Sequence, residues 1–207
     1  MIQSKHKERF KTGFVLHRFM WVELLIAGSI ILILLVVLGL FISIYNRFKT
    51  LRNGADAGLA QIKVALKKRL DMITQLVDTA KGYAEFEKKT MTEVTEMRSR
   101  VGQIKGAGEL SKLGNQSRKI LDNIIAVVEN YPELKSQENV NELMKAIQDV
   151  EDEISRHRYT FNNIIQEYNT KTDVVPSNMI ASVFHFEKLE YLEFDESEIS
   201  KRPVTEW

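Results

Sequence analysis

LLIAGSIILILLVVLGLFISI occupies residues 24–44 and carries no charged side chain over 21 consecutive positions. As an α-helix this run would be roughly 31 Å long at about 1.5 Å per residue, which matches the hydrocarbon core of a bilayer. A cleavable signal peptide has a shorter apolar region followed by a small-residue cleavage pattern, and no such pattern follows Leu40. The run therefore predicts one uncleaved transmembrane anchor over residues 21–45, with Trp21 and Tyr45 as interfacial rings at its ends.

The segment before the anchor, residues 1–20, is short, polar and basic. We expect it to be a disordered tail that lies on anionic lipid headgroups. Basic residues flank the anchor on both sides: Lys5, Lys7, Arg9, Lys11 and Arg18 precede it, and Arg47, Lys49, Arg52 and Lys63 follow it. By the positive-inside rule this margin of one charge predicts a single-pass protein of the cell membrane, with a cytoplasmic N-terminus and an external main domain.

The composition of the whole chain bounds the classes of function. The 207 residues include no cysteine, which excludes disulfides, thiolate zinc sites, iron–sulfur ligation and cysteine nucleophiles. The net charge of +1 combines +6 over residues 1–52, with eight Lys/Arg against two acids, and −5 over residues 53–207, with 21 against 26. Because the basic excess lies beside an apolar run instead of along a solvated face, we expect no nucleic-acid binding.

After the anchor, apolar residues recur every three or four positions, which is the pattern of one face of a long helix. They are Phe48, Leu51, Ala55, Leu59, Ile62, Leu66, Leu70, Ile73, Val77, Ala80 and Ala84, followed more weakly by Met91, Val94, Met97 and Val101. No proline occurs between Ile44 and Asn130, so we predict one helix from the membrane to about Arg100. Gly54 and Gly58 each lower helix propensity by about 1 kcal/mol relative to Ala, and a hinge there would contradict that prediction.

Two further helices follow a glycine-rich connection, VGQIKGAGELSKLG, that begins at Val101. The first carries Leu113, Ile120, Leu121, Ile124, Val127 and Val128 and ends before Pro132. The second begins at Ser136 and keeps a heptad, with Val140, Ile147, Ile154, Phe161 and Tyr168 in one position and Leu143, Val150, His157 and Ile164 in the other. Three long amphipathic helices with short loops predict an all-α fold, a long antiparallel up-down bundle over residues 46–187.

The chain after Thr172 differs in character, because Pro176 interrupts the helical pattern and aromatic residues follow. We predict a short helix from Met179, capped by Ser177 or Asn178. The aromatic residues are Phe184, Phe186, Tyr191 and Phe194. Our main interpretation is that this segment folds back onto the bundle, and the alternative is a docking surface for lipid or a protein partner. Residues 188–207 are expected to form an acidic C-terminal tail.

A search for catalytic chemistry finds none of the common motifs. There is no H-E-x-x-H, G-x-S-x-G or Walker string, so we expect no enzymatic activity, no cofactor and no metal. His157 occupies a seam position, where one polar residue commonly fixes helix register, and its protonation is expected to loosen the bundle. The cluster Lys67-Lys68-Arg69 is expected to be a solvated face, with a phosphate or lipid-headgroup contact as the alternative.

Motifs spread along residues 45–187 resemble the LemA family. They are Tyr45-Asn46, Leu51-Arg52-Asn53, Gln61 to Val64, Leu66 to Ile73, Leu76-Val77, Lys81-Gly82-Tyr83, Glu87, Arg98, Tyr131 to Lys135, Tyr168 to Lys171, Pro176-Ser177-Asn178, Phe184 and Phe186. Leu59 and Thr74 depart from the tryptophan and proline usual in that family, and residues 1–20 and 195–207 look like extensions. The resemblance implies a bacterial membrane-anchored helical bundle and carries no catalytic residues.

The sequence thus predicts a non-enzymatic membrane-anchored scaffold or protein-interaction module of the bacterial envelope. The candidate interaction residues are Arg47, Lys49, Arg52, Lys67, Lys68, Arg69, Phe184, Phe186, Tyr191 and Phe194. The expected partners are membrane lipid, through the anchor, and an unidentified protein, and a homo-oligomer remains open. A signalling relay through the anchor-continuous helix is the alternative, and a metal-binding bundle enzyme is a less favoured one.

Overall fold

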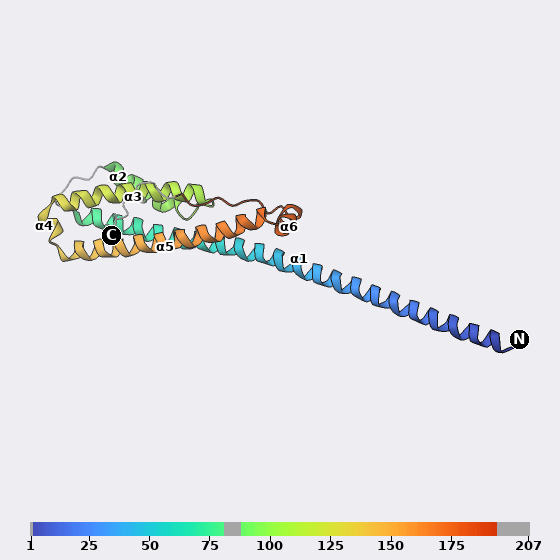
Figure 1. Cartoon of the computed structure of the whole chain (residues 1–207). Coiled ribbons are helices and arrows are strands. Elements are labelled where there is room, and N and C mark those ends of the chain that lie inside the picture. The colour runs from blue at the N-terminus through green and yellow to red at the C-terminus, as the bar shows by residue number, and fades with distance from the viewer. Residues whose placement is uncertain (1, 81–87, 194–207) are drawn as a thin grey trace, which may run out of the picture. The chain divides into compact units, whose positions relative to one another are not determined.

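The computed structural model describes the backbone of residues 2–80 and 88–193, and α-helix is the only regular secondary structure in this part of the chain (Figure 1). Its six helices are α1 (Ile2–Ala80), α2 (Lys88–Arg100), α3 (Ala107–Asn130), α4 (Pro132–Lys135), α5 (Glu138–Asp173) and α6 (Ser177–Val183). The chain divides into two compact units, Met1–Arg47 and Phe48–Trp207. The predicted all-α class is confirmed.

The first unit consists of the N-terminal part of α1. Its side chains from Trp21 to Phe41 are exposed, and of the described helices α1 is the one long and apolar enough to cross a membrane. Ser29 Oγ donates to Ile26 O at 2.7 Å, so this hydroxyl is bonded within the helix. Residues 2–20 are helical, and the predicted disordered tail is therefore wrong. Extending an existing helix avoids the unfavourable nucleation step, and no proline interrupts these residues.

The second unit is a bundle in which α1 from Phe48 onward, α2, α3 and α5 run in alternating directions (Figure 1). The apolar face predicted for α1 is buried in this unit, with Phe48, Leu70 and Ile73 at zero exposure. On α5 the first heptad position is buried throughout, from Val140 to Tyr168. At the second heptad position Val150 is buried, whereas Leu143, His157 and Ile164 are half-buried. The predicted antiparallel up-down bundle is thus confirmed.

The prediction of one helix from the membrane to about Arg100 is wrong. Helix α1 ends at Ala80, and α2 is a separate helix whose Arg98 Nε lies 2.7 Å from Asp71 Oδ1. On one straight helix these residues would be about 40 Å apart, at about 1.5 Å per residue. The chain therefore reverses, which buries Val94 and Met97 in the same core as α1, whereas a straight continuation would leave them in solvent.

Smaller differences appear at the helix ends. Helix α3 begins at Ala107 and includes Gly108 and Gly114, so only part of the glycine-rich stretch is a connection. Helix α5 begins at Glu138, after the short α4, instead of at Ser136. Helix α6 begins at Ser177 without a side-chain cap, so the predicted capping role is wrong.

Gly54 and Gly58 lie inside α1 and pack against α5. A Cβ placed on Gly54 would be 3.6 Å from Ile164 Cδ1, and one on Gly58 would be 3.4 Å from Phe161 Cδ2 and 3.8 Å from Phe161 Cα. The two helices therefore approach closely where α1 presents no side chain. The residues that lower helix propensity serve close packing and introduce no break in the helix assignment.

Candidate interaction surfaces

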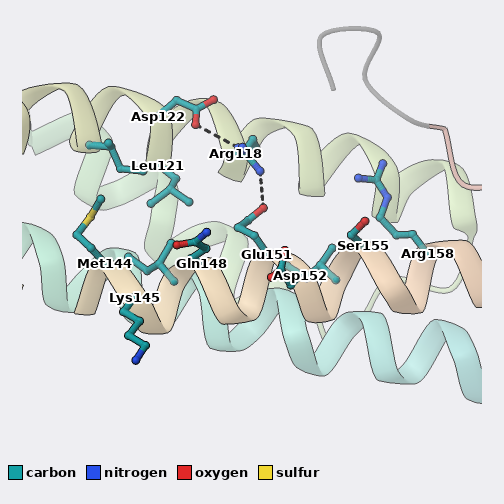
Figure 2. A pocket seen from close by; sticks show the side chains of 13 residues that line it. Arg118, Leu121, Asp122, Met144, Lys145, Gln148, Glu151, Asp152, Ser155 and Arg158 are labelled. Atoms are coloured by element: carbon teal, nitrogen blue, oxygen red, sulfur yellow. Dashed lines mark hydrogen bonds and ion pairs between the residues drawn. The ribbon is translucent and has the colours of Figure 1, made fainter. Parts of the chain in front are cut away.

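A groove of about 680 Å³ lies between α3 and α5 (Figure 2). Leu121 and Ile125, one turn apart on α3, face Met144 and Ile147 of α5 across its apolar part. Its polar lining consists of Arg118, Asp122, Lys145, Gln148, Glu151, Asp152, Ser155 and Arg158. This groove combines an apolar floor with charges of both signs.

Glu151 of the polar lining is bonded to a buried arginine from α1. The side chain of Arg69 is only 3% exposed, and its Nη1 donates to Glu151 Oε1 at 2.9 Å and Oε2 at 3.1 Å. Its Nη2 donates to Gly114 O at 2.6 Å and to Ser117 Oγ at 2.5 Å. One guanidinium thus joins α1, α3 and α5 through charge-assisted hydrogen bonds, with one nitrogen on the Glu151 carboxylate and the other on α3.

Arg118 completes this network at the groove wall. Its Nη1 donates to Glu151 Oε2 at 2.6 Å and its Nε donates to Asp122 Oδ1 at 3.1 Å (Figure 2). Burial alone would lower the pKa of the Arg118 guanidinium, but the charges of Glu151 and Asp122 outweigh burial and raise that pKa above its ordinary value. Glu151 therefore accepts from two arginines, and these charge-assisted hydrogen bonds fix the positions of the side chains in the groove wall.

The predicted basic cluster on α1 separates into three different environments. Lys67 is exposed, Lys68 Nζ lies 3.0 Å from Glu153 Oε2 of α5, and Arg69 is buried. The hydrogen bond from Lys68 lowers the pKa of Glu153, although partial burial opposes this shift. The expected solvated face is wrong for Arg69, because its guanidinium turns into the bundle towards Glu151.

His157 lies at the edge of the α5 seam, with its side chain 27% exposed. Its Nε2 is 3.6 Å from Glu153 Oε1, one turn earlier on the same helix. The nearby carboxylate offers a partner to the protonated ring. The predicted loosening of the bundle on protonation stays a prediction.

The aromatic segment after α6 folds back onto the bundle, as its main interpretation predicts. Phe186 is buried and stacks on Phe48 of α1, with centroids 4.7 Å apart, and Tyr168 of α5 meets Phe48 edge-on at 5.4 Å. Lys49 Nζ lies 5.6 Å from the Phe186 centroid. Burial raises the pKa of Tyr168, partly offset by Arg52. Phe186 is thus a core residue and not part of an exposed docking surface.

A backbone motif at the end of α6 directs Phe186 inward. The N–H of Phe186 donates to Ala181 O at 2.9 Å and that of His185 donates to Ser182 O at 3.4 Å, which is the pattern of a Schellman motif. His185 adopts φ 53° at the position where glycine is usual. This left-handed residue turns the chain back along α5.

Two asparagines of α5 then hold the returning backbone. Asn169 Nδ2 donates to Leu189 O and its Oδ1 accepts from Leu189 N, both at 2.9 Å. Asn162 makes the same pair of bonds with Leu192, again at 2.9 Å. Each amide satisfies both polar groups of one residue, so the segment is fixed without a partner strand. Sequence reasoning missed these residues, although polar residues seven apart on a helix lie on one face.

The remaining candidate residues are exposed or lie outside the described residues. Arg47, Lys49 and Arg52 are exposed, as are Phe184 and Tyr191. Phe194 lies outside the described residues. Among the side chains that the structure describes, residues 21–80 and 90–193, no three His, Asp or Glu side chains are grouped to hold a metal ion.

The described part of the chain is thus an all-α bundle protein with one N-terminal helix long and apolar enough to cross a membrane. The chain belongs to the LemA family, whose sequence model matches residues 58–207. The resemblance inferred from the motifs is confirmed, and residues 195–207 fall within the match, so they are no extension of the family pattern.

Individual relatives are distant but cover most of the chain. Protein LemA of Metamycoplasma hominis is 25% identical over 183 residues, covering 82% of this chain and 83% of its own. Magnetosome protein MamQ of Magnetospirillum gryphiswaldense is 23% identical over 209 residues, covering 88% of this chain and 76% of its own. Magnetosome protein MamQ 2 of Paramagnetospirillum magneticum is 22% identical over 186 residues, covering 77% of this chain and 68% of its own.

Proposed function

We propose that this protein is a non-enzymatic, single-pass membrane-anchored scaffold of the bacterial envelope that binds a protein partner in the groove between α3 and α5. The observation that carries the proposal is the groove itself, about 680 Å³ with an apolar floor and a charged rim. Family membership and a helix long and apolar enough to cross a membrane support the anchored setting. The partner is a protein segment, because the groove follows two helices.

An amphipathic helix matches this groove in its chemistry. Leu121 and Ile125 are spaced i, i+4 along α3, so they would meet apolar residues recurring at i, i+3, i+4 and i+7 on the incoming helix. Lys145 and Arg158 would pair with its acidic residues and Asp152 with a basic one. A helix bearing both charges beside an apolar stripe is therefore the expected ligand.

The network under the groove supports a binding role energetically. Arg69 and Arg118 hold Glu151 from two helices, so the polar wall is already ordered before a ligand arrives. Preorganised side chains lose less conformational entropy on binding, which leaves more of the contact energy for affinity.

Site-specific photocrosslinking in cells tests this proposal. A photoreactive amino acid at Met144 or Gln148 in the groove is expected to give one discrete adduct with a protein partner. The same amino acid at Tyr159 or Val64, which are exposed outside the groove, provides the control. Identical adducts at all four positions, or none in the groove, would contradict the proposal.

The membrane orientation is a separate part of the proposal. Five basic residues before the apolar run against four soon after it favour a cytoplasmic N-terminus and an external bundle. Reporters active only inside or only outside the cytoplasm, fused after Trp207, measure this directly. Cytoplasmic activity would show that the N-terminal charges do not set the orientation and that the partner is cytoplasmic.

A further inference from the structure

Apolar side chains are exposed where α5 ends and α6 begins. Val175 is 75% exposed, and Met179 and Val183, each four residues further on, are both 66% exposed. Val174 and Phe184 flank them at 46% and 41%. Exposed apolar residues gathered in one short segment indicate a surface that contacts something other than water.

This segment lies at the end of the bundle where the bundle part of α1 begins. Phe184 lies 6.2 Å from Phe186, centroid to centroid, and Phe186 stacks on Phe48 at 4.7 Å. The contact network ties α6 to the first residue of the second unit.

Chain length then limits how far this end can be from the apolar run. Phe48 follows Ile44, the last residue of the run, by four residues. Four residues span at most about 14 Å even when fully extended, whatever the orientation of the two units. The hydrocarbon core of a bilayer is about 30 Å thick, and the two polar headgroup layers raise the total thickness to about 40–45 Å. The short link between Ile44 and Phe48 therefore keeps this end of the bundle near the headgroup layer.

The charges near α6 favour an anionic surface. Lys49 and Arg52 are exposed on the first turns of the bundle part of α1, and Lys49 Nζ lies 5.6 Å from the Phe186 ring. Lys188 is exposed and paired with Asp173 at 2.8 Å, so this pair adds little net charge. Basic residues beside exposed apolar ones are typical of surfaces that bind anionic lipid headgroups.

We propose that the α6 surface, defined as Val174, Val175, Met179, Val183 and Phe184, inserts into the headgroup layer of the membrane that the apolar run spans. This docking rests on the proposed membrane anchoring. It gives the bundle a second attachment to the bilayer, made of side chains on α6 and next to its ends and assisted by Lys49 and Arg52.

The absence of native cysteine makes a direct test possible on the full-length protein. Single-cysteine variants Met179→Cys and Val183→Cys are labelled with an environment-sensitive fluorophore and reconstituted into vesicles of phosphatidylcholine and phosphatidylglycerol. Quenching by lipids carrying a quencher near the headgroup reports contact. Tyr131→Cys, exposed at the end of α3, is the matched control, and Leu32→Cys within the apolar run reports anchoring.

Blue-shifted emission and strong lipid quenching at positions 179 and 183, with little at 131, are the expected results. Equal, water-like emission at 179 and 131 while the label at 32 is quenched would overturn the α6 proposal and leave the anchor intact. Shielding at 179 without lipid quenching would also overturn it, because a protein or a second copy would then cover the surface. An unquenched label at 32 would instead contradict the anchoring itself.

Removing the charge from the lipid, or from Lys49 and Arg52, tests separately whether electrostatic attraction contributes to the docking. In vesicles of phosphatidylcholine alone, quenching at positions 179 and 183 is expected to fall at least twofold. The variant Lys49→Gln with Arg52→Gln is expected to show the same fall in anionic vesicles. Unchanged quenching in both cases would contradict a role for anionic lipid.

Discussion

Two clusters of lysine and arginine on α1 have different surroundings. Lys67, Lys68 and Arg69 lie against the middle of the bundle, where Arg69 is buried and Lys68 is paired with Glu153. Lys49 and Arg52 lie near the start of the bundle and are exposed. Charge type alone does not separate the clusters. In the first cluster Arg69 and Lys68 pair with Glu151 and Glu153 of α5, whereas in the second Lys49 lies over the Phe186 ring and Arg52 lies near Tyr168.

The largest effect should come from breaking the buried pair. The variant Arg69→Met leaves Glu151 with only Arg118, and removing one partner of a buried ion pair costs about 3 kcal/mol. Urea unfolding of the full-length protein in detergent measures this loss. The double variant Arg69→Met with Glu151→Met should recover most of it, since a well-packed apolar pair removes the uncompensated charge. Lys67→Met is the control and should change stability little.

The asparagine contacts near the second cluster should give the next largest effect. The variant Asn169→Leu leaves the N–H and C=O of Leu189 without their partner, which should cost about 2 kcal/mol. Hydrogen exchange is expected to rise at Leu189 and to change little in α3. Asn163→Leu, six residues earlier on the same helix and exposed, is the comparison variant. Equal effects of the two substitutions would show that the paired amide bonds do not hold this segment.

A stabilising change is expected at His185. Its φ of 53° is unfavourable for a residue with a Cβ and costs glycine nothing, so His185→Gly should stabilise the protein by about 1 kcal/mol. Thermal unfolding provides the measurement. A lower melting temperature would show that the imidazole makes a contact worth more than the backbone conformation costs.

The smallest effect should come from the exposed pair Lys68 and Glu153. A double-mutant cycle with Lys68→Met and Glu153→Gln should give about 0.5 kcal/mol at pH 7. Because folding lowers the pKa of Glu153, this contribution is complete above the ordinary carboxyl pKa and disappears as pH falls through the lower folded value. A coupling energy that persists well below that value would contradict an ionic origin.

Periodicity predicted the core, because burial selects apolar residues at the repeat of the helix. The positions on α1 from Phe48 to Ala80 and the heptad on α5 were identified in this way. The reversal between α1 and α2 was missed, since the apolar spacing of α1 continues in Val94 and Met97 of α2 as if the helix were unbroken. The spacing of apolar residues is the same whether a helix continues straight or the chain turns back. The ion pair between Asp71 and Arg98 shows that the chain turns back.

The candidate surfaces were predicted less completely, because their residues depend on helix phase. Arg69 is indistinguishable from Lys67 and Lys68 in sequence, and only the neighbouring Glu151 and Ser117 decide that it is buried. Phe184 and Phe186 are two residues apart, yet one is exposed and the other stacks in the core. The left-handed conformation of His185 separates them, and a histidine carries no sequence signal for it.

The Arg69 network also has a consequence for the order of folding events. Its bonds join positions separated by 45, 48 and 82 residues, so they require three helices to be in place at once. Contacts of such long sequence separation are expected to form after the transition state, where substitutions change the unfolding rate more than the folding rate. We therefore expect Arg69→Met to speed unfolding while leaving the refolding rate nearly unchanged. The buried guanidinium would then set how long the bundle stays folded, by slowing its unfolding.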